Sequence, residues 1–465
     1  MNKSQKESMI RGMKLLYFCL MSFMFAAIWF QCYDGLIHFE SPRRFGALFT
    51  GIFVLVFFLL IRIYEGVRIS IARVSVIVYS QLLSAIMADV IVYVTVCMLW
   101  GHMLPFMPMV WLLVGQIAIC VGWSWLVTKL YFALYPPRKT VALYRDEWDV
   151  SQMCELGTMT KKYNLQKMIC VPDQVDDTVL KELDGAEVVF VRGLPTNERN
   201  DVLKYCIQNG IVLYLWPKIG DVMLSGAEQT HMFHVPMMRV ARYNPKLEYL
   251  VAKRLLDIVI SLTGIVFMSP FMLITAVAIK LHDGGPVLYK QIRLTRDEKT
   301  FKILKFRSMR MDAEKDGIAR LSSGDSDDRI TPVGRIIRAI RFDELPQLFN
   351  ILKGDMSVVG PRPERPEIAE QYMKDIPEFK LRLQAKAGLT GYAQVYGKYN
   401  STPYDKLQMD LLYIARPSLF TDIKLILATI KVLFMKESTE GVEEGQTTAR
   451  MMSNETVKEK EETPV

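Results

Sequence analysis

The chain has 465 residues, which predicts roughly two to four domains, and 51% of them are hydrophobic. Its formal net charge of +8 at pH 7 does not form a basic stripe interleaved with aromatic residues, so we expect no nucleic-acid partner and attribute the charge to contacts with a membrane surface and with phosphates. Seven cysteines without CxxC spacing predict free thiols in a reducing compartment, and five unclustered histidines predict no zinc site.

The first part of the chain, residues 1–137, contains four apolar stretches of the length that a membrane helix needs, roughly 20 residues. They are residues 14–33, 45–63, 74–99 and 107–134. A signal peptide is the alternative for the first stretch, but no small-residue cleavage site follows it. We therefore predict a unit of four transmembrane helices.

The distribution of lysine and arginine predicts the orientation of this unit. Cations precede the first helix and lie in the second loop, whereas the third loop, GHMLPF, has none. The segment PPRK follows the fourth helix. Both ends of the unit are expected to face the cytoplasm, although Arg43 and Arg44 in the first loop fit this orientation less well.

Residues 138–249 read as a Rossmann-like α/β domain. The stretches KTVALYR, KMICVP, AEVVFVRG and IVLYLWP are typical of strands, and helix-like stretches separate them, which predicts a parallel layer. The turn after the first strand, YRDEWD, lacks the glycines of a phosphate-binding loop. A scaffold or oligomerisation role is favoured over ligand binding, which stays open.

Residues 250–437 form the last predicted folded block, and the polar tail 438–465 is predicted to be disordered. Within the block, PVLYKQIRL and KTFKILKFRSM read as two paired strands, with Lys305 and Arg307 on one face. Further on, AGLTGYAQVYGKYN places Gln394 where it could hold a base or sugar edge, although a structural turn is an equal alternative.

The most informative stretch is FDELPQLFNILKGDMSVVGPRPERPE. Asp343 and Glu344 follow three arginines, at 335, 338 and 341, whose spacing would place them on one helical face. An ionised aspartate can be a nucleophile, and a second carboxylate can hold Mg²⁺. Complementing a helix dipole is the alternative role of such a pair.

A second candidate feature is Arg362, which lies between Pro361 and Pro363. Both prolines have a fixed φ, so the arginine is expected on a stiff, extended segment suited to a phosphate contact. An ordinary proline-rich loop is the alternative at this point.

Taken together, the ordered motifs from KRLLDIVIS through FDELPQLFNILKGDMSVVGPRPERPE to DLLYIARPSLFTDIKLILATI closely resemble the bacterial sugar transferase family. The resemblance is to its monotopic polyprenyl-phosphate phosphoglycosyl transferases, which start exopolysaccharide, capsule or O-antigen synthesis. It covers residues 250–437, and the upstream parts resemble the N-terminal extension of the family's large members.

This resemblance implies an undecaprenyl-phosphate hexose phosphotransferase, with glucose or galactose as the expected sugar and an α+β catalytic domain. Asp343 would attack the sugar-linked phosphate of a UDP-sugar and release UMP, after which undecaprenyl phosphate would take the phosphosugar. Glu344 would help to hold Mg²⁺. Arg338 and the Pro361, Arg362 and Pro363 segment would contact the substrate, together with the residues expected above, Lys305, Arg307 and Gln394.

The sequence also departs from the family pattern at two places. The turn between the two strands, RLTRDEK, has Thr295 and Glu298 where the family usually has glycines. The segment KAGLTGYAQ has Ala387 and Tyr392 at positions that differ in the common family pattern, which leaves the identity of the sugar open.

The resemblance also implies the fate of the apolar stretch at about 255–281, SLTGIVFMSPFMLITAVAIK at its centre. A proline inside a helix costs about 3 kcal/mol. We expect the helix to enter the bacterial inner membrane from the cytoplasm, break at Ser269 and Pro270, and return to the same side, which keeps the catalytic domain with its soluble nucleotide. A kinked full span is the alternative.

Two other functions stay open: a catalytically inactive membrane scaffold, and a transferase with direct metal-bridged attack and no covalent intermediate. A homodimer through the α/β layer is compatible with the sequence, which does not decide the oligomeric state.

Overall fold

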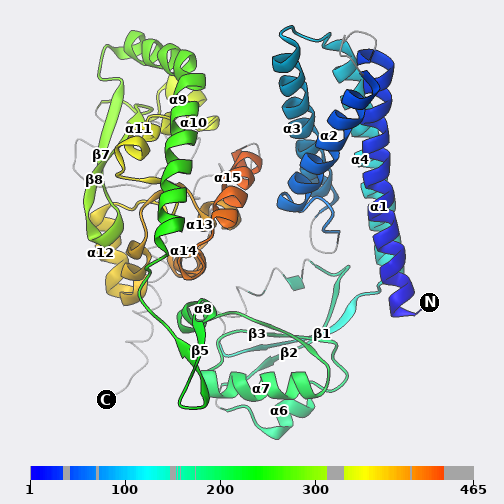
Figure 1. Cartoon of the computed structure of the whole chain (residues 1–465). Helices are drawn as coiled ribbons and strands as arrows, with labels where there is room; N and C mark the ends of the chain where they lie inside the picture. The colour runs from blue at the N-terminus through cyan, green and yellow to red at the C-terminus, as the bar shows by residue number, and fades with distance from the viewer. Residues whose placement is uncertain are drawn as a thin grey trace. The chain divides into compact units, whose positions relative to one another are not determined.

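The computed structural model describes residues 2–34, 42–69, 73–146, 153, 156–157, 159–172, 174–311, 329–397 and 401–433. The chain forms two compact units, Met1–Trp216 and Pro217–Val465 (Figure 1). The predicted disordered tail, 438–465, lies outside the described residues.

The first unit begins with four long apolar helices. They are α1 (Lys3–Ile28), which continues into a π-helical turn η1 (Trp29–Tyr33), α2 (Pro42–Ile63), α3 (Val74–Trp100) and α4 (Met107–Leu134). Aromatic rings pack between them: Phe25 stacks on Phe53 with centroids 4.2 Å apart, and Tyr17 lies 4.7 Å from Trp123. All four are long and apolar enough to cross a membrane, as predicted.

A parallel sheet follows in the same unit. Its strands are β1 (Arg138–Tyr144), β2 (Tyr163–Cys170), β3 (Val188–Val191) and β4 (Val212–Leu215), in the order β2-β1-β3-β4, with α6 (Asp177–Lys181) and α7 (Thr196–Gln208) between them. All four residues of β3 are buried, which explains its continuous apolar run. The four strand-like stretches of the sequence are therefore these strands, and the finer Rossmann-like classification stays a prediction.

The boundary between the compact units lies at Trp216, well before the expected domain end at 249. The reason is α8 (Ile219–Ser225), which buries Ile219 and Val222 in the core of the second unit. Arg416 also donates from Nε to the carbonyl of Ser225 at 2.7 Å. A hairpin of β5 (Glu228–Met232) and β6 (Val235–Arg239) follows.

The second unit combines helices with short strands. Its elements are α9 (Leu247–Asp283), β7 (Leu288–Leu294), η2 (Arg296–Glu298), β8 (Thr300–Phe306), α10 (Pro332–Ala339), η4 (Phe342–Glu344), α11 (Gln347–Lys353), β9 (Ser357–Val359), α12 (Pro366–Asp375), η5 (Pro377–Gln384), β10 (Gly388–Thr390), α13 (Tyr392–Tyr396), α14 (Pro403–Ala415) and α15 (Leu419–Leu433). Strands β7 and β8 pair antiparallel, and β9 pairs with β10 parallel. The core includes Leu348, Ile351 and Met356.

Helix α9 contains Pro270 and bends, yet it is helical from end to end, so the expected break is a bend within one helix (Figure 1). Because Pro270 has no amide hydrogen, it leaves the carbonyl of Val266 without its helical donor. The hydroxyl of Ser269 donates to that carbonyl at 2.9 Å. This substitute hydrogen bond reduces the cost of the proline.

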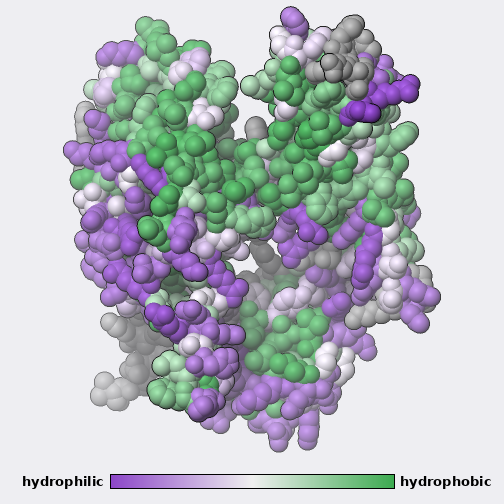
Figure 2. Space-filling view, in the orientation of Figure 1, coloured by the Kyte–Doolittle hydropathy of each residue, from purple (hydrophilic) through white to green (hydrophobic). Residues whose placement is uncertain are grey.

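The outer surface of α9 is apolar, and Figure 2 shows hydrophobic residues gathered over it. Examples are Val266, Phe267 and Ile274, which are 61–69% exposed. Like the four helices of the first unit, α9 is long and apolar enough to enter a membrane. Such a surface is favourable only against lipid or another apolar partner.

The inner face of α9 carries three polar side chains near its start, Lys253, Arg254 and Asp257. They hold three other elements: Lys253 Nζ lies 3.1 Å from Asp422 Oδ2 in α15, Arg254 donates to the carbonyls of Ile351 and Leu352 in α11 at 2.7 Å each, and Asp257 Oδ1 accepts the hydroxyl of Ser357 and the amide of Val358 in β9 at 3.0 and 2.8 Å. The membrane-type helix is therefore part of the framework of the second unit.

Candidate active site

The adjacent carboxylates Asp343 and Glu344 lie in η4, a single 3-10 turn between α10 and α11. Arg341, just before the turn, has a left-handed φ of 58°, which an L-residue adopts rarely. It therefore leaves the helical path that Arg335 and Arg338 follow in α10. The expectation that all three arginines share one helical face is wrong for Arg341, because the helix ends before it.

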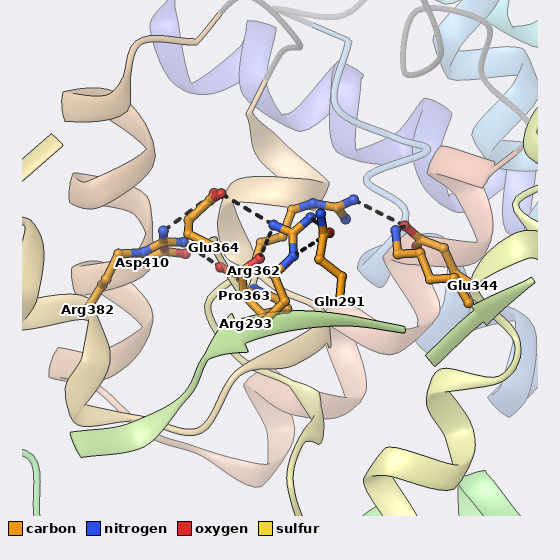
Figure 3. Close-up of polar contacts among 9 residues, drawn as sticks. Gln291, Arg293, Glu344, Arg362, Pro363, Glu364, Arg382 and Asp410 are labelled. Atoms are coloured by element: carbon orange, nitrogen blue, oxygen red, sulfur yellow. Dashed lines mark hydrogen bonds and ion pairs between the residues drawn. The ribbon is translucent and has the colours of Figure 1, made fainter. Parts of the chain in front are cut away.

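Glu344 is held by two cations. Its Oε1 atom lies 3.0 Å from Lys305 Nζ and 3.1 Å from Arg362 Nη2, and the contact with Arg362 is drawn in Figure 3. Burial alone would raise the pKa of this carboxyl, but the charges of Lys305, Arg362 and Arg341 outweigh it and the pKa falls below its usual range. Glu344 is therefore a carboxylate at neutral pH.

Asp343 has the opposite shift. Burial, followed by the negative charge of Glu344, raises its pKa, although Lys305, Arg338 and Arg341 oppose this. A pair whose environments push the two pKa values apart is typical of residues with distinct catalytic roles. Here Glu344 is fixed in its charge, while Asp343 can gain or lose a proton closer to neutral pH than an exposed aspartate would.

Arg362 is carried by an extended segment, Pro361–Glu364, which we call the strap. Each of its four successive carbonyls accepts a hydrogen bond: Pro361 from the amide of Gly388 at 2.9 Å, Arg362 from Arg382 Nη2 at 3.0 Å, Pro363 from Arg293 Nη1 at 3.0 Å, and Glu364 from the amide of Leu294 at 2.9 Å. These four hydrogen bonds, together with the two prolines, account for the expected stiffness of this segment.

The two arginines that hold the strap are neutralised by carboxylates (Figure 3). Arg382 donates to Asp410 Oδ2 from Nε at 2.9 Å, and the two side chains are 4% and 1% exposed. Glu364 lies between both arginines, 3.6 Å from Arg382 and 3.8 Å from Arg293. Gln291 Oε1 accepts two further bonds from Arg293. Reading the sequence alone missed this network.

Lys305 reaches Glu344 because strand β8 is docked on α11. Asn350 acts as a backbone mimic there: its Oδ1 accepts from the amide of Leu304 and its Nδ2 donates to the carbonyl of Lys302, both at 2.9 Å. Asn350 is 3% exposed. This residue was not predicted from the sequence, although it joins β8, which carries Lys305, to α11, the helix that follows η4 and Glu344.

Two residues predicted to contact the substrate, Arg307 and Gln394, have other partners in the structure. Arg307 follows the end of β8 and pairs with Asp283 at the end of α9. Gln394, in α13, donates from Nε2 to the carbonyl of Leu389 at 3.2 Å. Neither has a described contact with Glu344, so their roles at the substrate stay predictions.

The donor set at Asp343 and Glu344 fits a magnesium ion that is bound mainly through its substrate. Among the described residues, no group of three or more His, Cys, Asp or Glu could hold a metal by itself. Mg²⁺ commonly takes one or two protein carboxylates and completes its shell with waters and phosphate oxygens. Asp343 and Glu344 supply two carboxylates of this kind, and Arg362 lies beside them on Glu344.

Comparison with known proteins identifies the family. A family model described as bacterial sugar transferase matches residues 248–436, from α9 to beyond α15. A UDP-glucose:undecaprenyl-phosphate glucose-1-phosphate transferase of Caulobacter vibrioides is 40% identical over 199 residues, which cover 42% of this chain and 74% of the relative. The chain belongs to the bacterial sugar transferase family.

Two further relatives of this bacterial sugar transferase extend the match. A UDP-N-acetylgalactosamine-undecaprenyl-phosphate N-acetylgalactosaminephosphotransferase of Aeromonas hydrophila is 41% identical over 234 residues, 50% of this chain and 54% of the relative. A UDP-glucose:undecaprenyl-phosphate glucose-1-phosphate transferase of Xanthomonas campestris is 36% identical over 312 residues, 63% of each protein. The matched part thus spans about half to two thirds of these two relatives.

Proposed function

We propose that this chain transfers a sugar 1-phosphate from a UDP-sugar to undecaprenyl phosphate, releasing UMP, as the first step of exopolysaccharide, capsule or O-antigen synthesis. The names of the relatives support the reaction class. The observation that carries the proposal is the arrangement of Asp343 beside a Glu344 whose charge Lys305 and Arg362 hold in place.

In the proposed first step, a carboxylate oxygen of Asp343 attacks the sugar-linked phosphorus of the UDP-sugar. The bond from that phosphorus to the oxygen that bridges the two phosphates breaks, and UMP leaves with that oxygen. The phosphosugar is now joined to Asp343. Because the attacking form is the carboxylate, the aspartate must lose its proton before this step.

In the second step, a phosphate oxygen of undecaprenyl phosphate attacks the same phosphorus. The bond to Asp343 breaks and the free carboxylate returns, while the product is an undecaprenyl diphosphate sugar. A covalent intermediate lets a soluble donor and a lipid acceptor use the same phosphorus position in turn, since neither needs to be bound when the other reacts.

Cationic side chains stabilise the charge of the transferring phosphoryl group in this proposal. Arg362 is the main candidate, because its side chain is 42% exposed while one nitrogen stays on Glu344. Arg338 acts on Asp343 through its charge. When bound, Mg²⁺ would be held by Glu344 and would offset phosphate charge.

The location of the protein follows from the same proposal. Helix α9 would lie re-entrant in the bacterial inner membrane, with the catalytic unit on the cytoplasmic side, where UDP-sugars are made. The apolar surface of α9, its bend and the proline inside it support this arrangement (Figure 1).

The test uses the full chain, purified in detergent with Mg²⁺ and supplied with UDP-glucose, UDP-galactose, UDP-N-acetylglucosamine or UDP-N-acetylgalactosamine, with and without undecaprenyl phosphate. We expect lipid-dependent UMP release with one sugar and a stoichiometric UMP burst without lipid. Turnover without a burst would favour direct transfer. Folded protein that releases no UMP from any donor would favour the alternative, an inactive membrane scaffold.

A further inference from the structure

We infer that Arg293 and Arg382 are positioning residues, which hold the strap by its carbonyls so that Arg362 is preorganised for the UDP-sugar. This inference rests on the proposed function. It assigns no contact between these two arginines and the substrate; they would act through Arg362.

The need for such residues comes from the strap's own sequence. Pro361 and Pro363 have no amide hydrogen, so the strap lacks two of the donors by which an extended segment normally pairs with a sheet. Its carbonyls are then the groups left to fix it. A carbonyl can be held by a backbone amide or by a side-chain donor, and the strap uses both.

Backbone amides hold the two ends of the strap. Gly388 donates to Pro361, and Leu294 donates to Glu364, each at 2.9 Å. The two central carbonyls, of Arg362 and Pro363, have no strand amide on them in the described hydrogen bonds and are held by guanidiniums. The centre is where Arg362 projects, so its orientation depends on these side chains.

Arginine suits this position because of its charge and shape. A guanidinium has five donors in one plane, so it can hold a carbonyl and a counter-ion at the same time. Arg382 does this with Asp410. Arg293 holds the carbonyl of Pro363 together with the neutral amide oxygen of Gln291, and its counter-ion is Glu364 at 3.8 Å. Lysine, a single point of charge, would keep the charge but not the forked set of contacts.

The charges around the two supporting arginines, Arg293 and Arg382, also differ from those around Arg362. The negative charges of Asp410 and Glu364 balance them, whereas Arg362 shares Glu344 with Lys305 and stays 42% exposed. The geometry thus separates a substrate-facing arginine from two supporting ones. Removing a support should weaken donor binding by leaving Arg362 free to adopt other positions, a cost that preorganisation avoids.

The primary test is Arg293→Met, which removes the donors but keeps a long side chain. Arg293 is preferable to Arg382, since Arg382→Met would leave the buried carboxylate of Asp410 unpaired and endanger folding. We expect the KM for the UDP-sugar to rise about tenfold, the loss typical of one hydrogen bond from a charged donor. The KM for undecaprenyl phosphate should stay unchanged. Arg293→Lys should give a KM for the UDP-sugar between those of the wild type and Arg293→Met.

A double-mutant cycle tests whether the effect passes through Arg362. In an Arg362→Ala background, Arg293→Met should raise the KM for the UDP-sugar little further, because the side chain to be positioned is gone. The exposed Arg239→Met is the matched control and should leave donor KM unchanged in both backgrounds. The inference would be overturned if the two substitutions raised the KM for the UDP-sugar additively. It would also be overturned if Arg293→Met raised the KM for the UDP-sugar and the KM for undecaprenyl phosphate equally.

Amide hydrogen exchange provides a readout that needs no turnover. Arg293→Met should speed exchange at the amides of Gly388 and Leu294, which hold the ends of the strap, and leave the amides of α14 protected. Unchanged exchange at both amides would overturn the inference by itself. If the wild-type protein releases no UMP but Arg293→Met still shows the faster exchange, the result would contradict the proposed function and leave the inference about the strap in place.

Discussion

Lys305 Nζ and Glu344 Oε1 lie 3.0 Å apart, and the same oxygen accepts Arg362. Two protein cations thus occupy the oxygen of a carboxylate that we propose as a magnesium ligand. A metal ion must therefore share Glu344 with these cations or use its other oxygen. The balance between the side chains and the metal is open to direct measurement.

Lys305→Met should lower the Mg²⁺ concentration for half-maximal UMP release. One competing cation would be removed, and a partly exposed ion pair is worth about 1 kcal/mol, so the change should be about fivefold. Lys302→Met is a matched control, because Lys302 lies on the same strand with an exposed side chain. A half-maximal Mg²⁺ concentration that is unchanged or higher in Lys305→Met would count against metal binding at Glu344.

The pH dependence should report Asp343. Its pKa is raised, and the attacking form is the carboxylate, so the rate of the UMP burst should fall as the pH drops through that raised value. The loss should begin above about pH 4, where an exposed aspartate titrates. Glu344 has a lowered pKa and should stay ionised throughout this range.

The same profile has an internal check. Lys305 lowers the pKa of Asp343, so Lys305→Met should move the acid limb to higher pH, while Lys302→Met should leave it in place. A limb that moves to lower pH, or does not move, would show that another group controls the acid side.

Asp343→Asn should abolish both UMP turnover and the burst without lipid, because the amide cannot form the phosphosugar ester. Asp297→Asn is the matched control: Asp297 is exposed and has a left-handed φ of 58°, a conformation that asparagine accepts readily. It should keep near wild-type activity. Activity of Asp343→Asn within tenfold of wild type would remove Asp343 as the nucleophile.

The proposed re-entrant path of α9 predicts that its two ends are reached from one side of the membrane. Single cysteines at Lys246 and His282, which are exposed, should react with an impermeant maleimide only in inside-out vesicles of a cysteine-free background. A cysteine at Met103, between α3 and α4, should react only from the other side. Labelling of Lys246 and His282 from opposite sides would show a full span.

Part of the fold could be predicted from the sequence because local patterns determine it. The four helices of the first unit are long apolar runs, and β3 is a fully buried run of β-branched and aromatic residues. The end of the α/β region could not be predicted in this way. The residues of helix α8 are predicted from the sequence to belong to the α/β domain, and only their packing in the core of the second unit assigns the helix there.

The candidate site shows the same division. Pro361 and Pro363 predict a stiff segment around Arg362, but the donors that hold it come from Arg293, 70 residues before Pro363, and Arg382, 20 residues after Arg362. Such pairings depend on the tertiary fold. Asp410 did offer a signal, since a carboxylate in the apolar stretch QMDLLYIA needs a partner, but the sequence does not say which of 57 lysines and arginines it is.

Arg307 illustrates how local reasoning stops at the end of an element. Alternation along a strand would place it on the same face as Lys305, but β8 ends at Phe306. Beyond that residue the alternation no longer applies, and Arg307 instead pairs with Asp283.

The polar contacts of α9 have a consequence for how the protein is made. The partners of Arg254, Asp257 and Lys253 lie 97, 101 and 169 residues further along the chain. In the proposed arrangement, the ribosome therefore delivers α9 to the bilayer before these partners are synthesised. Until then these three polar side chains lie at the membrane surface without their partners, where the free-energy cost of a polar group is lower than in the bilayer core.

Since Asp422 in α15 is the last of these partners to be translated, we expect the docking of α15 to complete the unit. Stalled nascent chains that end after α14 should then remain sensitive to protease, and those that include α15 should become resistant. Equal resistance of both would show that α9 is secured by α11 and β9 alone.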